Sequence, residues 1–244
     1  MQNNTIEMLG YLRRVVVDMG VEVSDDQYRL LATYYEFLME YNQKMNLTRI
    51  VEPLDVAAKH FGDSLALLAQ PCLISGSLIA DVGTGAGFPG IPLAIMRSDI
   101  QVVLVDSLRK RTIFLAEAVE LMGLRNVQVV WTRAEDMGRN RSYRQKFDVV
   151  LARAVAPLNV LVELCLPLLK IGGSFLAMKG PKADEEIIQA QVAIAKLGGA
   201  VVSSTVTPLP LVEENRTLIS IKKIKPTIAL YPRKAGTPER QPLL

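Results

Sequence analysis

Apolar positions in the first quarter of the chain recur at helical spacing. Between residues 28 and 41 the apolar and aromatic side chains fall three or four positions apart, which predicts an amphipathic helix. The preceding sequence, Ser24-Asp25-Asp26-Gln27, has the capping-box pattern that begins a helix. A further helix is expected over 53–69, because a proline occupies its first turn and another, Pro71, follows it. Residues 1–75 are therefore predicted to form a helical segment.

From residue 77 the pattern changes to short, continuous apolar runs separated by helical segments. Such runs are typical of strands in a sheet covered on both faces, and their alternation with helices favours a parallel sheet. The runs span 78–82, 102–106, 127–131, 147–152 and 174–178. The helical segments span about 90–97, 108–123, 158–170 and 184–198.

The end of the chain has a different pattern. Residues 201–207 and 217–224 form two strand-like runs joined by a loop too short for a crossover, which predicts an antiparallel pair and brings the sheet to seven strands. The last residues are rich in proline, glycine and basic side chains. We expect a helical segment over 1–75, packed on an α/β domain over 76–225, and an irregular basic tail over 226–244.

Composition narrows the class of protein. The chain has 244 residues, of which 50% are hydrophobic and 22% charged, so it is not a wholly disordered protein. Cys72, Cys165 and His60 are its only cysteines and histidine. They cannot build a zinc site or a disulfide framework, so no metal is expected and a cytoplasmic location is the default. The most apolar stretch, 154–169, is broken by polar residues and prolines, so no membrane span is expected.

Charge is spread unevenly along the chain. The formal net charge is −4 over residues 1–75, +4 over 76–180 and +3 over 181–244. This distribution favours a polyanionic partner for the last two-thirds of the chain, although a lysine-rich solvated face gives similar counts.

The loop after the first strand, DVGTGAGFPG from Asp81 to Gly90, allows two interpretations. Gly85-x-Gly87-x-x-Gly90 matches the dinucleotide-binding fingerprint, in which free N–H groups at a helix start meet a pyrophosphate. Gly83-x-Gly85-x-Gly87 after an acidic strand end matches the loop of S-adenosylmethionine-dependent methyltransferases. Asp81 suits a cationic cofactor, and Pro89 removes an N–H where a phosphate would need one. We favour the second interpretation. A glycine-rich turn that only joins a strand to a helix and binds no ligand remains as the other alternative.

Two further acidic positions follow strand ends. Asp106 closes the second strand, where a carboxylate accepts hydrogen bonds from ribose hydroxyls. The same residue could instead cap the helix that follows. Ala134 and Glu135 follow the third strand, where they would face an adenine ring or form a solvated turn.

With these motifs the chain resembles the bacterial ribosomal RNA small subunit methyltransferase G family, also called glucose-inhibited division protein B. The glycine loop alone is typical of a whole superfamily, whereas KHFGDSL and DVVLARAVA are specific to this family. The matching stretches span 42–48, 59–65, 81–93, 105–107, 133–135, 147–154, 178–180 and 231–234. They cover nearly the whole chain.

The resemblance implies a Rossmann-like class I methyltransferase fold and transfer of a methyl group from S-adenosylmethionine to ring nitrogen 7 of a guanine in 16S ribosomal RNA, conventionally position 527. It implies a cofactor site at Gly83, Phe88, Ala134, Glu135 and Arg153. The partner would be 16S ribosomal RNA or a small-subunit particle. Nothing in the sequence fixes the oligomeric state, and a monomer is the default expectation.

The residue chemistry agrees with ring nitrogen 7 as the target. A pyrimidine carbon would need a cysteine nucleophile, but Cys72 precedes the first strand and Cys165 lies inside an apolar helix. Ring nitrogen 7 has an exposed lone pair and no proton, so alignment is needed rather than a general base. Arg153 ends the fourth strand and is the candidate positioning group, for the cofactor or for guanine.

Candidate contacts to RNA are less specific. His60 and Asp63 share one helix face and could line the substrate mouth or serve only in packing. The basic residues could bind phosphates or form a solvated surface. The candidates for RNA binding are His60, Asp63, Arg133, Arg139, Arg141 and Lys179, with Arg109, Lys110, Arg111, Arg144 and Lys146 as further basic groups. A nicotinamide-dependent oxidoreductase and a non-enzymatic RNA-binding assembly factor remain as alternatives.

Overall fold

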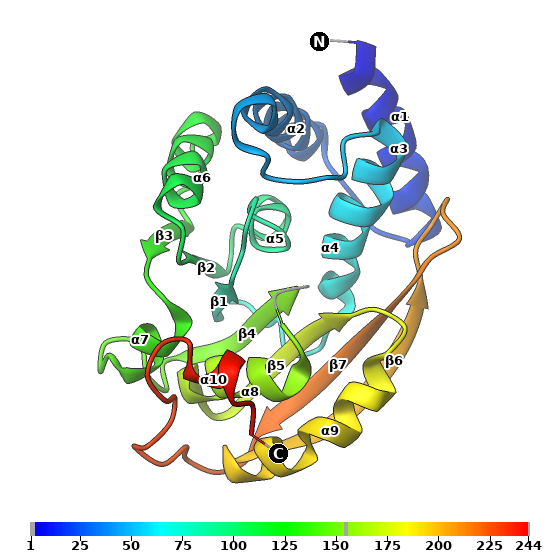
Figure 1. Ribbon diagram of the computed structural model, residues 1–244. Coiled ribbons are helices and arrows are strands. Elements are labelled where there is room, and N and C mark those ends of the chain that lie inside the picture. The colour runs from blue at the N-terminus through cyan, green and yellow to red at the C-terminus, as the bar shows by residue number, and fades with distance from the viewer. Residues whose placement is uncertain (1–2, 154–155, 244) are drawn as a thin grey trace.

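The computed structural model describes residues 3–153 and 156–243 and is built around a seven-stranded sheet (Figure 1). The strands lie in the order β3-β2-β1-β4-β5-β7-β6. Strands β1 to β5 are parallel, and β7 is antiparallel to both β5 and β6. The strands are β1 (Leu78–Val82), β2 (Gln101–Asp106), β3 (Val127–Trp131), β4 (Phe147–Arg153), β5 (Leu169–Lys179), β6 (Gly199–Pro208) and β7 (Asn215–Lys223).

Helices cover both faces of this sheet, and each face has its own hydrophobic core. One face carries α1 (Asn3–Asp18), α2 (Asp25–Met45), α5 (Gly90–Met96), α6 (Arg109–Met122) and a helical run over 53–69. The other carries α7 (Ala134–Arg139), α8 (Leu158–Cys165), α9 (Ala183–Lys196) and α10 (Thr237–Arg240). The predicted fold class, a mostly parallel seven-stranded sheet with an antiparallel C-terminal pair and N-terminal helices, is confirmed.

The helices within residues 3–75 pack directly onto the sheet. Ser24 caps α2 with the expected reciprocal capping box. Residues 53–69 form one continuous helical run whose helix type changes along its length. It consists of α3 (Pro53–Asp55), a wider π-helical turn (Val56–Gly62), α4 (Asp63–Leu65) and a 3₁₀ turn (Ala66–Ala69). The wide turn lies against α1, since a Cβ on Gly62 would be 2.8 Å from Val15 Cγ1. The helices therefore share one hydrophobic core with β1, β2, β4 and β5.

The largest differences from the predictions lie before β5 and in the C-terminal tail. The helix expected over 158–170 ends earlier, because Pro167 lies within a 3₁₀ turn (Leu166–Leu168), and β5 starts at Leu169 rather than at residue 174. The tail, expected to be irregular, contains a helical turn over 237–240, and Tyr231 and Leu243 are buried. Among the described residues, no helix combines the length and apolarity needed to cross a membrane.

Candidate functional site

The loop between β1 and α5 is shaped by glycines. Gly83, Gly85 and Gly87 all have positive φ angles, 70°, 63° and 88°, a conformation that side-chain-bearing residues rarely adopt. A Cβ on Gly87 would lie 2.6 Å from both Ile91 Cδ1 and the Tyr34 hydroxyl oxygen. The loop therefore needs glycine for its backbone angles and, at position 87, also for close packing.

Asp81, near the end of β1, fixes this loop through hydrogen bonds. Its Oδ2 accepts hydrogen bonds from Thr84 Oγ1 at 2.7 Å and from the Gly90 amide at 2.9 Å. The side chain is completely buried, and burial raises the pKa of Asp81 to about 6. Asp81 lines neither of the two hollows described below, so the structure gives this expected cofactor residue a role in shaping the loop.

The backbone N–H groups of the loop are largely used within the protein. The amides of Gly87 and Phe88 donate to Thr84 O, that of Gly90 to Asp81, and that of Ile91 to Gly87 O. Position 89 is proline and has no N–H. These amides are not free to bind a pyrophosphate, so the loop geometry disfavours the dinucleotide interpretation.

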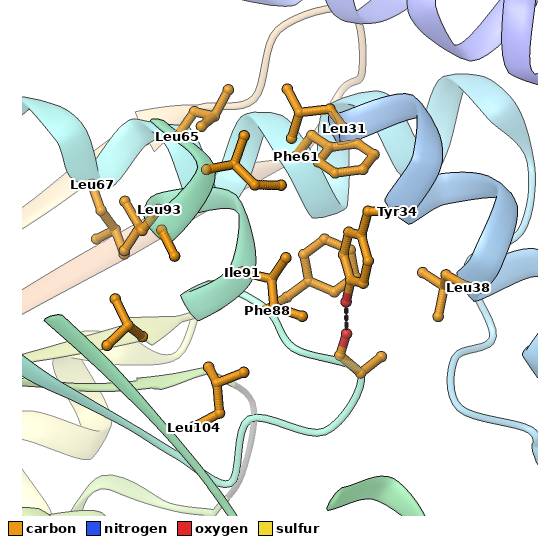
Figure 2. Packing of buried hydrophobic residues seen from close by; sticks show 14 of the residues in the cluster. Leu31, Tyr34, Leu38, Phe61, Leu65, Leu67, Phe88, Ile91, Leu93 and Leu104 are labelled. Carbon is orange, nitrogen blue, oxygen red and sulfur yellow. Dashed lines mark hydrogen bonds between the residues drawn. The ribbon is translucent and has the colours of Figure 1, made fainter. Parts of the chain in front are cut away.

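Helix α2 contacts the loop through Tyr34, and the sequence did not predict this contact. The Tyr34 hydroxyl donates a hydrogen bond to the carbonyl oxygen of Ala86, and its ring lies 5.4 Å from that of Phe88 between centroids. Figure 2 shows Tyr34 below Phe61 and beside Phe88, with its hydroxyl reaching down to the loop. The aromatic side chains of α2 thus belong to the core, as the amphipathic pattern predicts, and one of them, Tyr34, also fixes the glycine loop.

Asp106 stands at the end of β2 between two hollows. Its Oδ2 accepts from the Gly85 amide at 3.0 Å and its Oδ1 from the Leu108 amide at 2.8 Å, and Arg111 Nη1 lies 3.4 Å from Oδ2. Asp106 therefore connects the loop to the start of α6. It is 3% exposed and lines both hollows.

The smaller hollow, of about 180 Å³, lies between the ends of β1 and β2 and helix α8. Its walls are partly apolar, from Ala134, Val160 and Leu164, with polar edges from Asp106 and Glu135. This combination suits a flat aromatic base attached to a sugar. Residues near the C-terminus also line this hollow, which the sequence did not indicate.

The larger hollow, of about 470 Å³, lies on the other side of Asp106. The glycine loop forms one wall, and residues from the N-terminal segment and from the end of β4 form the rest. Its lining includes Leu47, Thr48, His60, Gly83, Gly85, Phe88, Asp106, Arg111 and Arg153. Expected cofactor residues and expected substrate residues therefore meet in one space.

Arg153 is mostly buried and holds several groups together. Its Nη1 donates to the Lys59 carbonyl oxygen at 3.0 Å and to Asp63 Oδ2 at 3.2 Å, and its guanidinium lies 5.2 Å from the centre of the Phe88 ring. Asp63 is 2% exposed and also lies 3.5 Å from Arg216 Nε. Burial raises the pKa of Asp63, and the two guanidinium groups oppose that rise.

His60 is packed rather than free. Its ring stacks on Phe88 with a centroid distance of 4.4 Å, its Nε2 is 2.9 Å from Thr48 Oγ1, and its Nδ1 is 3.2 Å from Arg153 Nη2. Burial, with the positive charges of Arg153 and Arg216, lowers the pKa of His60 to about 3. The imidazole is therefore neutral near pH 7, with both ring nitrogens engaged.

The basic candidates for RNA binding divide into two groups. Arg133 and Arg141 are exposed, as are Arg109 and Lys110. Arg139 is exposed as well, but its Nε donates to the Pro232 carbonyl oxygen at 2.8 Å. Lys179 is 7% exposed and is held by the Ala156 carbonyl oxygen at 2.6 Å and Glu186 Oε2 at 2.7 Å. Arg144 donates to four backbone carbonyl groups. Lys179 is therefore ion-paired within the protein, and Arg139 and Arg144 are bound to backbone groups, whereas no such bond to a described residue holds the first group.

Sequence reasoning missed several residues of this site. Thr48 lies in the matched NLT stretch but was not singled out, and Arg216 comes from β7, more than 150 residues after Asp63. No spacing rule joins such distant positions. Ala154 and Val155, which follow Arg153 in the sequence, lie outside the described residues.

The sequence profile of the family described as GidB, rRNA small subunit methyltransferase G, matches residues 27–218. The chain belongs to this family. It is 45% identical over 235 residues to a protein of Desulforamulus reducens named ribosomal RNA small subunit methyltransferase G, covering 95% of this chain and 97% of that relative. A protein of the same name from Lactobacillus delbrueckii subsp. bulgaricus is 49% identical over 224 residues, covering 91% and 94%.

Solved structures show the same fold at low identity. A SAM-dependent O-methyltransferase of Thermotoga maritima aligns with a TM-score of 0.51 at 18% identity, covering 77% of this chain and 71% of that one. This likeness, with the strand order, confirms the class I methyltransferase fold. As an RNA methyltransferase family member, the chain is an enzyme whose cofactor is S-adenosylmethionine.

The two hollows fit that cofactor. The smaller one has an apolar interior and acidic edges, and Asp106 stands where the two meet. Beside Gly85 the space is open, since a Cβ there would meet nothing closer than Gly83 O at 3.9 Å. Asp106 and Glu135 would hold the adenosine part, and Gly83, Gly85 and Phe88 would border the rest.

Proposed function

We propose that this protein transfers the methyl group of S-adenosylmethionine to ring nitrogen 7 of a guanine in 16S ribosomal RNA, either free or in a small-subunit particle. The cofactor, when bound, supplies an electrophilic methyl group on a sulfonium. The observation that carries the choice of target atom is the state of His60: buried, neutral near pH 7 and hydrogen-bonded at both ring nitrogens. A cytoplasmic location follows from this substrate.

The groups around the larger hollow are arranged to position a substrate rather than to take a proton from it. Asp63 is bound by Arg153 and lies beside Arg216, and Asp106 is bound by two backbone amides. Among the described residues of this lining, no carboxylate or imidazole is left free as a general base. Ring nitrogen 7 of guanine needs none, because it attacks with an exposed lone pair.

Other target atoms fit less well. A pyrimidine carbon requires a cysteine thiolate. Cys165 is fully buried, burial raises the pKa of its thiol, and it lines neither hollow; Cys72 is half-buried and lines neither. The cysteines therefore support no covalent mechanism at this site.

A methyl-transfer assay tests this proposal directly. We expect tritiated methyl groups to enter 16S ribosomal RNA, or small-subunit particles, from cells that lack this protein, and the label to appear at ring nitrogen 7 of one guanine. RNA binding without any transfer would support the assembly-factor alternative instead. Binding of NADH but not S-adenosylmethionine in a fluorescence titration would support the oxidoreductase.

The RNA surface has its own test. We expect that replacing Arg109, Arg133 and Arg141 together with alanine flattens the slope of log affinity against log salt by roughly two to three units, because each lost phosphate contact removes released counterions. All three side chains are exposed. The matched control is Lys44→Ala, which removes an exposed charge on α2. A triple variant with the wild-type slope would place the phosphate contacts elsewhere.

A further inference from the structure

The C-terminal segment forms part of the smaller hollow. Pro238 and Glu239 line it together with Ala134 and Glu135, although about a hundred residues separate the two pairs in the chain. We refer to residues 231–240 as the strap. Figure 1 shows this stretch folding back beside α7 and α8, with α10 at its end. The predicted irregular tail thus reaches the cofactor site.

A buried ion pair holds the strap in place. Glu163 on α8 is completely buried, and its two carboxylate oxygens accept from Arg233: Oε1 from Nε at 2.9 Å and Oε2 from Nη2 at 2.6 Å. Oε1 also accepts from the Arg233 backbone amide at 2.8 Å. A buried carboxylate is costly unless it is paired in this way, so the pair favours a docked strap. Glu163 has no part in the proposed methyl transfer.

Two further contacts connect the strap to the walls of the hollow. The Gly236 amide donates to Glu135 Oε1 at 2.7 Å, so the strap itself orients an expected cofactor residue. At the other end of α7, a Cβ on Gly138 would lie 2.8 Å from Pro232 Cγ and 3.1 Å from its Cδ. The Pro232 ring can approach α7 this closely only because residue 138 is glycine.

We propose that the strap closes the adenine end of the cofactor site and that Glu239 selects adenine by accepting a hydrogen bond from its 6-amino group. The inference rests on the proposed use of S-adenosylmethionine. Glu135 already accepts from Gly236, whereas Glu239 makes no hydrogen bond or ion pair with other described residues. A carboxylate only accepts hydrogen bonds, so it attracts the 6-amino group of adenine and repels the 6-oxo group of hypoxanthine.

The test compares ligand affinities by calorimetry in three variants. Gly138→Ala adds one methyl group beneath Pro232 and leaves the strap sequence intact. We expect it to weaken binding of S-adenosylhomocysteine by about tenfold. Glu239→Gln supplies both an acceptor and donors, so the preference for S-adenosylhomocysteine over S-inosylhomocysteine should fall about tenfold or more. Lys234→Ala, an exposed strap residue that does not line the hollow, is the matched control and should bind as wild type does.

The outcomes separate the strap from the proposed function. Thermal unfolding of the free proteins checks that each variant is folded, and Glu239, being exposed, can be replaced without disturbing the core. If wild type binds S-adenosylhomocysteine and Gly138→Ala and Glu239→Gln behave as wild type, the strap inference is wrong while the proposed function stands. If wild type itself does not bind this ligand, both are wrong. Emission of Trp131, the only tryptophan in the chain, gives a second readout, because its Nε1 donates to Ser107 O beside both hollows.

Discussion

The two hollows of the cofactor site are closed by opposite ends of the chain. The larger hollow is bordered by the N-terminal helices, through His60 and Thr48, and the smaller one by the strap, through Pro238 and Glu239. Between them lie the glycine loop and Asp106, which belong to the strand–helix core. The site is thus completed by segments that come before and after the strand–helix core in the chain.

The two closures are built differently. At the helix end, side chains bind one another: Arg153 holds Asp63 and contacts His60, and Phe88 packs against both Arg153 and His60. At the strap end, the Arg233–Glu163 ion pair is accompanied by side-chain bonds to backbone, as where Arg139 and Arg144 donate to strap carbonyl groups. Changes at the helix end should therefore affect chemistry most, and changes at the strap end should affect docking and stability most.

The largest expected effect on stability is at the strap end. Arg233→Ala leaves the carboxylate of Glu163 buried without its ionic partner, which should lower the free energy of unfolding by about 3–5 kcal/mol. Denaturant unfolding measures this loss. The double variant Glu163→Leu with Arg233→Met removes both charges and should recover most of it. A loss of under about 1 kcal/mol in the single variant would show that the ion pair does not hold the strap.

At the helix end the main effect should be on the rate of methyl transfer. Arg153→Ala removes the group that holds Asp63 and borders the larger hollow, and we expect it to lower the single-turnover rate by an amount equivalent to about 2–4 kcal/mol. His60→Ala should lower the rate less, because a neutral, hydrogen-bonded imidazole has no base role to lose. The reverse order of effects would contradict both the role of Arg153 and a mechanism without a general base.

Sequence reasoning succeeded where structure is local and failed where it depends on distant partners. The strands were predictable because continuous apolar runs mark a sheet covered on both faces, and the glycine loop because its residues adjoin in sequence. The partner of Arg233 lies 70 residues away in α8, and nothing in the Pro/Gly-rich tail indicates it. Composition also cannot distinguish Arg141 from Arg139, whose Nε donates to the strap carbonyl of Pro232.

The site residues show the same limit. The resemblance brought together His60, Asp63 and Arg153 as candidates, but the contacts of Arg153 with the other two span 90 and 93 residues of sequence. Lys179 was one of the basic candidates for RNA binding. The fold instead places it beside Glu186 and the Ala156 carbonyl, where its charge is paired. Such pairings depend on the approach of β5 to the start of α9, which no local pattern describes.

The buried histidine should also make stability depend on pH. Since the pKa of His60 falls from 6.5 to about 3 on folding, the unfolded chain binds a proton below pH 6.5 that the folded protein does not. Stability is therefore full above pH 6.5 and is lost as the pH falls, by about 2 kcal/mol at pH 5. The raised pKa of Asp81, about 6, acts in the opposite direction. The pH dependence of stability in the wild type therefore combines both groups and does not isolate His60. The difference between wild type and His60→Gln isolates the histidine, and a difference that does not change between pH 7 and 5 would show that His60 is not buried and neutral.

The smallest expected effect concerns Tyr34, which connects the N-terminal helices to the glycine loop. Tyr34→Phe keeps the ring contact with Phe88 but removes the hydrogen bond to the Ala86 carbonyl, which should cost about 1 kcal/mol and raise the dissociation constant for S-adenosylhomocysteine roughly fivefold. Ala86 borders the larger hollow and not the smaller one, so affinity for adenosine alone should change less. Tyr41→Phe is the matched control, because that hydroxyl on the same helix binds Glu117 at an exposed position. Equal losses for adenosine and for the full ligand would mean that the loop acts on both hollows together, and the division between a helix end and a strap end would then be wrong.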